Sequence, residues 1–222
     1  MSTPTDAEIA DLCAQIYEPN AVNIFDYFDA GADDGVCWGL VRRDGADVIV
    51  FRGSVTLRDW LRDLNDMLTS TRVGHVHSGF YAGMERTWAE VQGLLRQGAI
   101  VAGHSLGAAH ADILTGLMVA DGVPPIARVV FGEPKPGLLD FAKIVERVPG
   151  RSYRNGDPEH HDLITDVPFS FPPLQYVHPT PIIPVCCRPN DGLFSELGLF
   201  AWHGIDLYQK ALASLLATAP AA

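Results

Sequence analysis

Basic side chains are scarce in this sequence. It has 16 lysines and arginines against 27 aspartates and glutamates, which gives a formal net charge of -11. A field of that sign repels the phosphates of nucleic acids and the headgroups of anionic lipids. We therefore expect no nucleic-acid partner and no electrostatic capture by an anionic bilayer, whereas a neutral or apolar substrate is compatible with this charge.

Cysteines are also few, and they do not form a recognisable framework. The four lie at Cys13, Cys37, Cys186 and Cys187 and lack the paired spacing of a zinc site. In a reducing compartment such scattered residues are thiols more often than disulfides. The sequence thus predicts no metal site, and we expect no organic cofactor either.

A secretory leader and a membrane-spanning helix are missing as well. The first residues, MSTPTDAEIADL, contain no basic region followed by an apolar run, which predicts a cytoplasmic protein, although a secreted form trimmed from a precursor is compatible with them. Residues 167–187 lack charged side chains over a length that could cross a bilayer, but they include six prolines. Because proline breaks a helix, we expect a loop there and no transmembrane segment.

The hydrophobic pattern predicts one α/β domain over residues 1–222. Strand-like and helix-like segments alternate, which favours a mostly parallel sheet with helices on both faces. An Asp-Gly pair at 44–45 predicts a hairpin between the first two strands, and residues 156–200 are dominated by proline and loops. The expected helices are 7–17, 56–68, 78–97, 106–119, 138–148 and 204–216, and the expected strands are 36–41, 46–53, 99–103, 128–132 and 151–155.

The string Gly103-His104-Ser105-Leu106-Gly107 suggests a nucleophile. A serine held on a sharp turn between a strand and a helix is exposed to substrate, and the helix N-terminus behind it stabilises negative charge. The short strand before this string and the small-residue helix after it supply both parts. The alternative is a helix N-cap with glycines that allow close packing, and the surrounding strand and helix favour the nucleophile.

A serine nucleophile needs a histidine base, which in proteins built this way follows the serine in the chain. His203 lies just before the last expected helix and is the first candidate. His178 is the second, and His110, on the apolar stripe of the helix after Ser105, is expected to be a core histidine.

Four segments together resemble the class 3 lipase family, the fungal and bacterial triacylglycerol lipases. They are VIVFRGSVTLRDWLRDL at 48–64, VHSGFY at 76–81, the GHSLG string, and VVFGEPKPG at 129–137. The resemblance implies an α/β-hydrolase fold and a serine carboxylester hydrolase that acts on acylglycerols. It also implies Ser105 as nucleophile and the backbone N–H groups of Ser54 and Leu106 as the oxyanion hole.

Several points stay open beside this resemblance. The catalytic acid is expected at Asp162, ahead of Asp157 and Asp166, because the spacing from Asp162 to Pro168 matches the family without a gap. Residues 55–68 fit a mobile lid and a packed helix equally, and the proline-rich loop fits an acyl-binding wall or a plain surface loop. Other esters, a phospholipid substrate, transient contact with a lipid interface and a catalytically silent binding module are the remaining alternatives.

Overall fold

The computed structural model describes residues 3–32, 35–54, 68–157, 159–170, 172–189 and 200–218. In these ranges seven strands form one sheet in the order β1-β2-β3-β6-β7-β8-β9, in which β3 to β9 pair in parallel and β1 and β2 pair antiparallel. The strands are β1 (Tyr27–Asp29), β2 (Trp38–Arg43), β3 (Ala46–Phe51), β6 (Ala99–His104), β7 (Ala127–Phe131), β8 (Gly150–Asn155) and β9 (Ile182–Val185).

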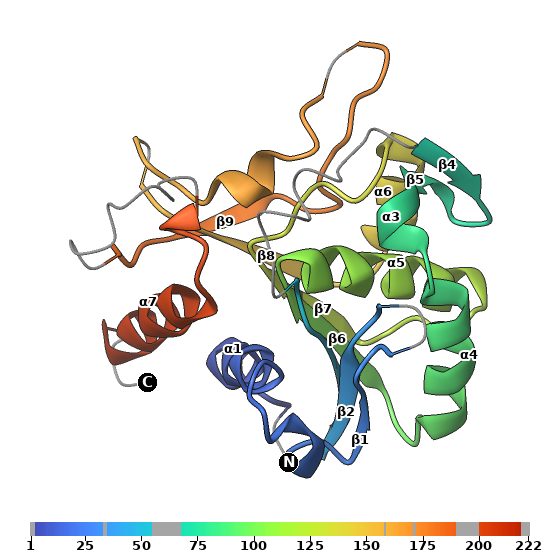
Figure 1. The fold of residues 1–222 in the computed structure, drawn as a ribbon, viewed down its shortest axis with the longest axis horizontal. Helices are drawn as coiled ribbons and strands as arrows, with labels where there is room; N and C mark the ends of the chain where they lie inside the picture. Colours follow the sequence, from blue (N-terminus) through green and yellow to red (C-terminus); the bar gives the residue numbers. More distant parts are fainter. Residues whose placement is uncertain are drawn as a thin grey trace.

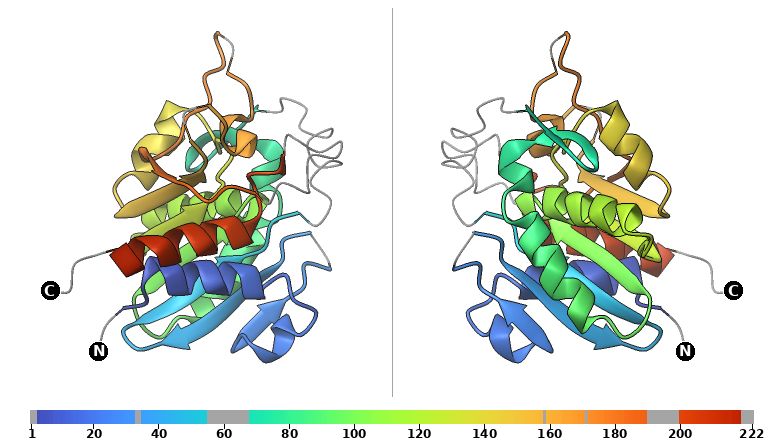
Figure 2. Two further views of the ribbon diagram at one scale, coloured as in Figure 1. Left: turned by 90° about the vertical axis from the view of Figure 1, so that its left-hand side faces the viewer. Right: turned by 90° about the vertical axis from the view of Figure 1, so that its right-hand side faces the viewer.

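Helices cover both faces of this sheet (Figure 1). On one face α1 and α7 pack side by side, and the opposite face is covered by α5 with α3, α4 and α6 around it, as the two side views in Figure 2 show. A separate two-stranded hairpin, β4 with β5, adjoins α6. The elements are α1 (Asp6–Gln15), α3 (Ser78–Tyr81), α4 (Met84–Leu94), α5 (Leu106–Ala120), α6 (Leu139–Val145), α7 (Ile205–Thr218), β4 (Leu68–Thr71), β5 (Gly74–His77) and the 3₁₀ turns η1 (Ala21–Asn23) and η2 (Leu163–Asp166).

The sheet separates two apolar cores. Every residue of β3 and β6 is buried, as expected for parallel strands that are covered on both faces. Alternate side chains enter opposite cores: Ile49 and Val101 pack under α5, whereas Val48 and Ile100 pack under α1 and α7. Because the parallel strands run in one direction, the residues that follow β3, β6, β7 and β8 gather at one edge of the sheet.

The predicted sheet and most predicted elements are confirmed, with three differences. The expected helix 78–97 is wrong as a single helix: α3 ends at Tyr81, Gly83 has a left-handed φ of 79°, and α4 starts at Met84. The end of the proline-rich segment is not a loop but the edge strand β9, where Pro184 is tolerated. Strands β1, β4 and β5 are short and were not expected, and β4 includes Leu68, which the sequence placed in a helix. The rest of the expected 56–68 helix or lid lies outside the described residues.

Candidate active site

Ser105 occupies a sharp turn between β6 and α5. It has φ 61° and ψ -131°, and among the described residues it is the one non-glycine residue with a positive φ. Such a conformation is strained and persists only where the surroundings enforce it. A Cβ on Gly103 would lie 2.1 Å from the Gly107 carbonyl oxygen, and a Cβ on Gly107 would lie 2.3 Å from that of Phe51. The glycines on either side of Ser105 are therefore required by close backbone contacts.

The end of β3 lies directly against this turn. A Cβ on Gly53 would approach the His104 carbonyl oxygen to 2.6 Å and the Ser105 Cβ to 2.8 Å. Ser54 is the next residue, and Leu106 begins α5, so its backbone N–H has no acceptor within the helix. The structure thus places Ser54 beside Ser105 from one side and the positive N-terminus of α5 on the other. This is the arrangement in which two backbone N–H groups can bind an oxyanion.

A buried carboxylate and imidazole form a pair at the same edge of the sheet. His203 Nδ1 lies 2.7 Å from Asp162 Oδ2, and the second oxygen of Asp162 accepts a hydrogen bond from the Ile164 N–H at 3.0 Å. Burial alone would raise the pKa of Asp162, but the contacts with His203 and Tyr208 lower it below its ordinary value. The carboxylate therefore stays ionised and can orient the imidazole.

The end of β7 brings this pair to Ser105. The Ser105 N–H donates to the Phe131 carbonyl oxygen at 3.0 Å, and the next residue is Gly132. A Cβ on Gly132 would lie 2.7 Å from Asp162 Oδ2 and 2.9 Å from His203 Cε1. Serine, aspartate and histidine are thus collected around one glycine, which has a left-handed φ of 57°.

Two polar atoms at this edge are buried without a hydrogen-bond partner among the described residues: Ser105 Oγ and His203 Nε2. Buried polar atoms of this kind are rare and mark sites where a ligand or a reaction completes the bonding. The Nδ1 atom of His203 is already engaged by Asp162, so Nε2 is the nitrogen available to a substrate or to Ser105. A nucleophile and a base are each left with the atom that the chemistry uses.

The other candidates from the sequence lie elsewhere. Asp157 accepts hydrogen bonds from the N–H groups of Glu159 and His160 in its own turn. Asp166 pairs with His161 at 2.8 Å. The second candidate base, His178, donates from Nε2 to the Thr165 carbonyl oxygen at 2.8 Å.

His104 and Tyr17 support the site in a way that the sequence did not indicate. Tyr17 Oη accepts a hydrogen bond from the Gly53 N–H at 2.9 Å and donates to His104 Nδ1 at 3.0 Å. The opposite nitrogen, Nε2, lies 2.7 Å from the carbonyl oxygen of His203 and must donate to it. Burial lowers the pKa of His104 to about 3, so its ring is neutral and carries its proton on Nε2. The network joins α1, the end of β3 and the loop that carries His203.

Tyr208, on α7, is a second residue that sequence reasoning missed. Its hydroxyl donates to Asp162 Oδ2 at 2.5 Å, the same oxygen that faces His203. No local pattern links a tyrosine to a carboxylate so far away in the chain. A motif search alone would therefore not have found it.

We expect Tyr208→Phe to lower kcat about tenfold, since a hydrogen bond to a charged group is worth roughly 1.5–3 kcal/mol and holds the carboxylate in place. Without this donor Asp162 interacts more strongly with the protonated imidazole, so the acid limb of the pH–rate profile should move to higher pH. Tyr153→Phe is the matched control, because it also loses a hydrogen bond to a carboxylate, that of Asp6. An unchanged profile for Tyr208→Phe would contradict this role.

His110 is buried in α5 beside Phe51, with ring centroids 5.9 Å apart, as expected for a core histidine. Burial lowers its pKa to about 4. In the unfolded chain the ring takes up a proton near about pH 6.5, so between these values the unfolded state binds more protons and stability falls as the pH drops.

We therefore expect His110→Gln to reduce the loss of unfolding free energy between pH 7.5 and pH 4.5 by about 2.5 kcal/mol. Urea unfolding of both proteins at the two pH values measures this. The same pH dependence in both would show that His110 is not the titrating group.

Within the described ranges, no group of three or more histidine, cysteine, aspartate or glutamate side chains is placed to hold a metal ion. In the same part of the chain, no helix is both long enough and apolar enough to cross a membrane.

Comparison with known proteins identifies the family. The model of the class 3 lipases matches residues 48–171, which is more than half of the chain and includes β3, the Ser105 turn and Asp162. The chain belongs to the class 3 lipase family. The resemblance seen in four segments of the sequence is thereby confirmed.

Individual relatives extend this result. The chain is 27% identical over 228 residues to phospholipase A1-II 4 of Oryza sativa subsp. japonica, an alignment that covers 86% of this chain and 55% of that protein. It is 31% identical over 147 residues to a lipase of Caenorhabditis elegans, covering 59% of this chain and 40% of that protein. The chain thus spans about half or less of the length of these relatives.

Among solved structures, the chain is similar to the mono- and diacylglycerol lipase from Aspergillus oryzae. The TM-score is 0.68 at 17% identity, with 85% of this chain and 82% of that chain covered. At this identity the likeness shows the fold. It confirms the expected α/β-hydrolase fold, a mostly parallel sheet flanked by helices.

Proposed function

We propose that this class 3 lipase family member is a serine carboxylester hydrolase with Ser105, His203 and Asp162 as its catalytic triad. The observation that carries the proposal is the His203–Asp162 pair, 2.7 Å apart and next to Ser105, which leaves His203 Nε2 and Ser105 Oγ buried and unpartnered among the described residues. A cap serine in a packed helix start would need neither an oriented imidazole nor a strained backbone.

The reaction follows from these positions. His203 Nε2 takes the proton of the Ser105 hydroxyl as Oγ attacks the ester carbonyl carbon, and Asp162 stabilises the imidazolium that forms. The N–H groups of Ser54 and Leu106 bind the carbonyl oxygen as it becomes negative. His203 then gives its proton to the leaving alcohol, and a water molecule, deprotonated by the same nitrogen, releases the acid from the acyl-enzyme.

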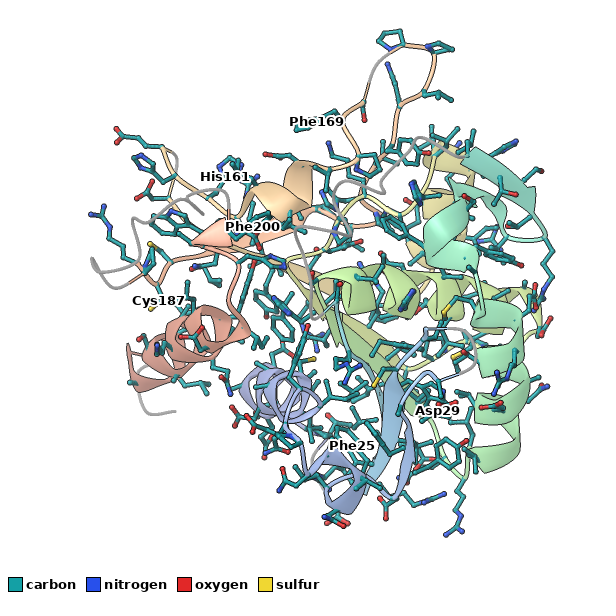
Figure 3. The ribbon with its side chains drawn as sticks, in the orientation of Figure 1. Phe25, Asp29, His161, Phe169, Cys187 and Phe200 are labelled. Carbon is teal, nitrogen blue, oxygen red and sulfur yellow. The ribbon has the colours of Figure 1, made fainter. Side chains whose placement is uncertain are left out.

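We propose lipid esters as the substrate class. Apolar side chains are exposed next to the acid: Leu163 follows Asp162 directly, and Phe169, 65% exposed, lies on the loop that rises from the sheet (Figure 3). These side chains suit transient contact with a lipid aggregate, and the acidic charge of the chain favours neutral lipids over anionic ones. Acylglycerols are the first candidate. Phospholipids are the second, because one relative is a phospholipase A1.

The test combines active-site labelling with a substrate panel. A fluorophosphonate probe should label the wild-type protein and not Ser105→Ala. Hydrolysis of tributyrin and of phosphatidylcholine vesicles should then be followed by titration of the released acid, with tributyrin taken through its solubility limit. A rise in rate at that limit is expected for an enzyme that works at lipid interfaces.

Each alternative has its own outcome. Preference for phosphatidylcholine over tributyrin would make the protein a phospholipase. Hydrolysis of soluble p-nitrophenyl butyrate with no rise at the tributyrin limit would make it an esterase. A folded wild-type protein that neither takes up the probe nor hydrolyses any ester would be a binding module of the same fold, and the proposal would be wrong.

A further inference from the structure

Two consecutive cysteines follow the edge strand β9. Cys186 is exposed and Cys187 is half-buried at the periphery of the molecule (Figure 3). The other two cysteines, Cys13 and Cys37, are buried, and burial raises the pKa of both thiols. The thiolate is the reactive form, so exchange with a solvent-borne reagent is confined to the consecutive pair.

A buried asparagine connects this pair to the active site. Asn155, the last residue of β8, accepts a hydrogen bond from the Cys187 N–H at 2.8 Å. Its side-chain amide donates to the Cys187 carbonyl oxygen at 3.0 Å and to the Trp202 carbonyl oxygen at 3.1 Å. Trp202 immediately precedes His203. The side chain of Asn155 therefore ties the cysteine backbone to the loop that carries the base.

The backbone of Asn155 connects to the acid as well. Its carbonyl oxygen accepts a hydrogen bond from the Asp162 N–H at 2.9 Å. Asn155 has no exposed surface, so an atom that loses its partner there is not compensated by water. A change in the backbone of Cys187 is thus felt by the residues that position His203 and Asp162.

We propose that Cys186 and Cys187 form a thiol–disulfide site, in which closure of a disulfide between the two neighbours lowers the activity of the enzyme through Asn155. The effect on activity rests on the function proposed above, whereas the thiol chemistry does not. Small disulfides such as oxidised glutathione are the proposed oxidant.

The exchange balances in two steps. One cysteine thiolate attacks the small disulfide, which forms a mixed disulfide and releases one small thiol. The second thiolate attacks the cysteine sulfur of the mixed disulfide, which closes the protein disulfide and releases the second small thiol. Each protein thiol gives up one proton, and each released thiolate takes one up. Two electrons pass from the protein pair to the small disulfide.

Closure must change the backbone that Asn155 holds. The Cys186–Cys187 peptide bond is trans in the structure, and the Cα atoms across a trans bond are about 3.8 Å apart. Ordinary disulfides span about 4.4–6.8 Å between Cα atoms, so a ring between neighbours is strained. The Cys187 N–H belongs to this ring and must turn from the Asn155 acceptor. The same strain makes the disulfide easily reducible, which makes the effect reversible.

The test treats the full-length protein with oxidised glutathione and follows three quantities. We expect the intact mass to fall by two hydrogens with no glutathione retained, and the change to map to the peptide that contains both cysteines. Hydrolysis of p-nitrophenyl butyrate should fall about tenfold, the size of effect produced by losing one buried hydrogen bond, and return with dithiothreitol. Hydrogen exchange should increase in residues 200–208.

Cys186→Ser and Cys187→Ser are the matched controls. Each should keep full activity when reduced, and under the oxidant each should retain one glutathione instead of losing two hydrogens. Asn155→Ala should still form the disulfide but show no further loss of activity on oxidation.

Three results would overturn the proposal: a wild-type protein that retains glutathione, a disulfide-linked dimer, or a closed disulfide with unchanged activity and unchanged exchange in residues 200–208. If the disulfide forms and exchange rises, but neither the reduced nor the oxidised protein hydrolyses an ester, the thiol site stands and the proposed function fails.

Discussion

Replacing Ser105 with alanine is expected to lower kcat by about a million-fold, the loss that follows when a serine nucleophile is removed from an intact triad. The oxyanion donors at Ser54 and Leu106 remain, so a residual rate of about a thousand-fold over water should persist. Initial rates on p-nitrophenyl butyrate measure both. Near-full activity in this variant would overturn the assignment of Ser105 and the mechanism that depends on it.

A second substitution at the same position separates chemistry from backbone strain. Ser105 has φ 61° and ψ -131°, a region that only glycine adopts readily. Ser105→Gly should therefore be as inactive as Ser105→Ala but more stable than it, by about 1–2 kcal/mol in urea unfolding. Equal stability of the two would mean that the turn stores no strain for the nucleophile.

The parts of the site that could be predicted from the sequence are those that depend on neighbours in the chain. The turn at Ser105 is such a part, because a strand, two glycines and a helix occur within one short segment and each is specified locally. The end of β3 at Ser54 is another, since a continuous apolar run followed by glycine marks where a buried strand stops. These local signals carried the fold class and the place of the nucleophile.

The parts that could not be predicted are made by contacts between distant segments. Nothing near Tyr208 indicates that its hydroxyl faces Asp162, or that the amide of Asn155 reaches Trp202. The strand β9 was missed for the same reason: its prolines predict a loop, and only pairing with β8 turns it into an edge strand. Such contacts follow from the closed fold and not from any pattern in the chain.

The choice among the three aspartates shows both limits and is settled best by mutation. Asp162→Asn is expected to lower kcat by about ten-thousand-fold, as loss of the triad carboxylate does where geometry is otherwise kept. Three donors point at Asp162: the Ile164 N–H at one oxygen, and His203 Nδ1 and the Tyr208 hydroxyl at the other. An asparagine has one acceptor oxygen and cannot serve both positions.

Either orientation of that asparagine is unfavourable. With its amide toward Ile164, a donor faces a donor. With its amide toward His203, the imidazole must carry its proton on Nε2 and cannot act as a base. The buried mismatch should also cost about 1–3 kcal/mol of stability, which urea unfolding measures.

Asp157→Asn is the matched control, because the oxygen of its amide can still accept from the N–H groups of Glu159 and His160. The contact of Asp157 with Arg188 is at the surface, so this variant should fold normally and keep activity within about threefold of wild type. If Asp157→Asn is the crippled protein and Asp162→Asn remains active, the acid of the triad is Asp157 and the hydrogen bond between Asp162 and His203 is structural. The same pair of variants, unfolded in urea, shows whether lost activity reflects lost chemistry or lost folding.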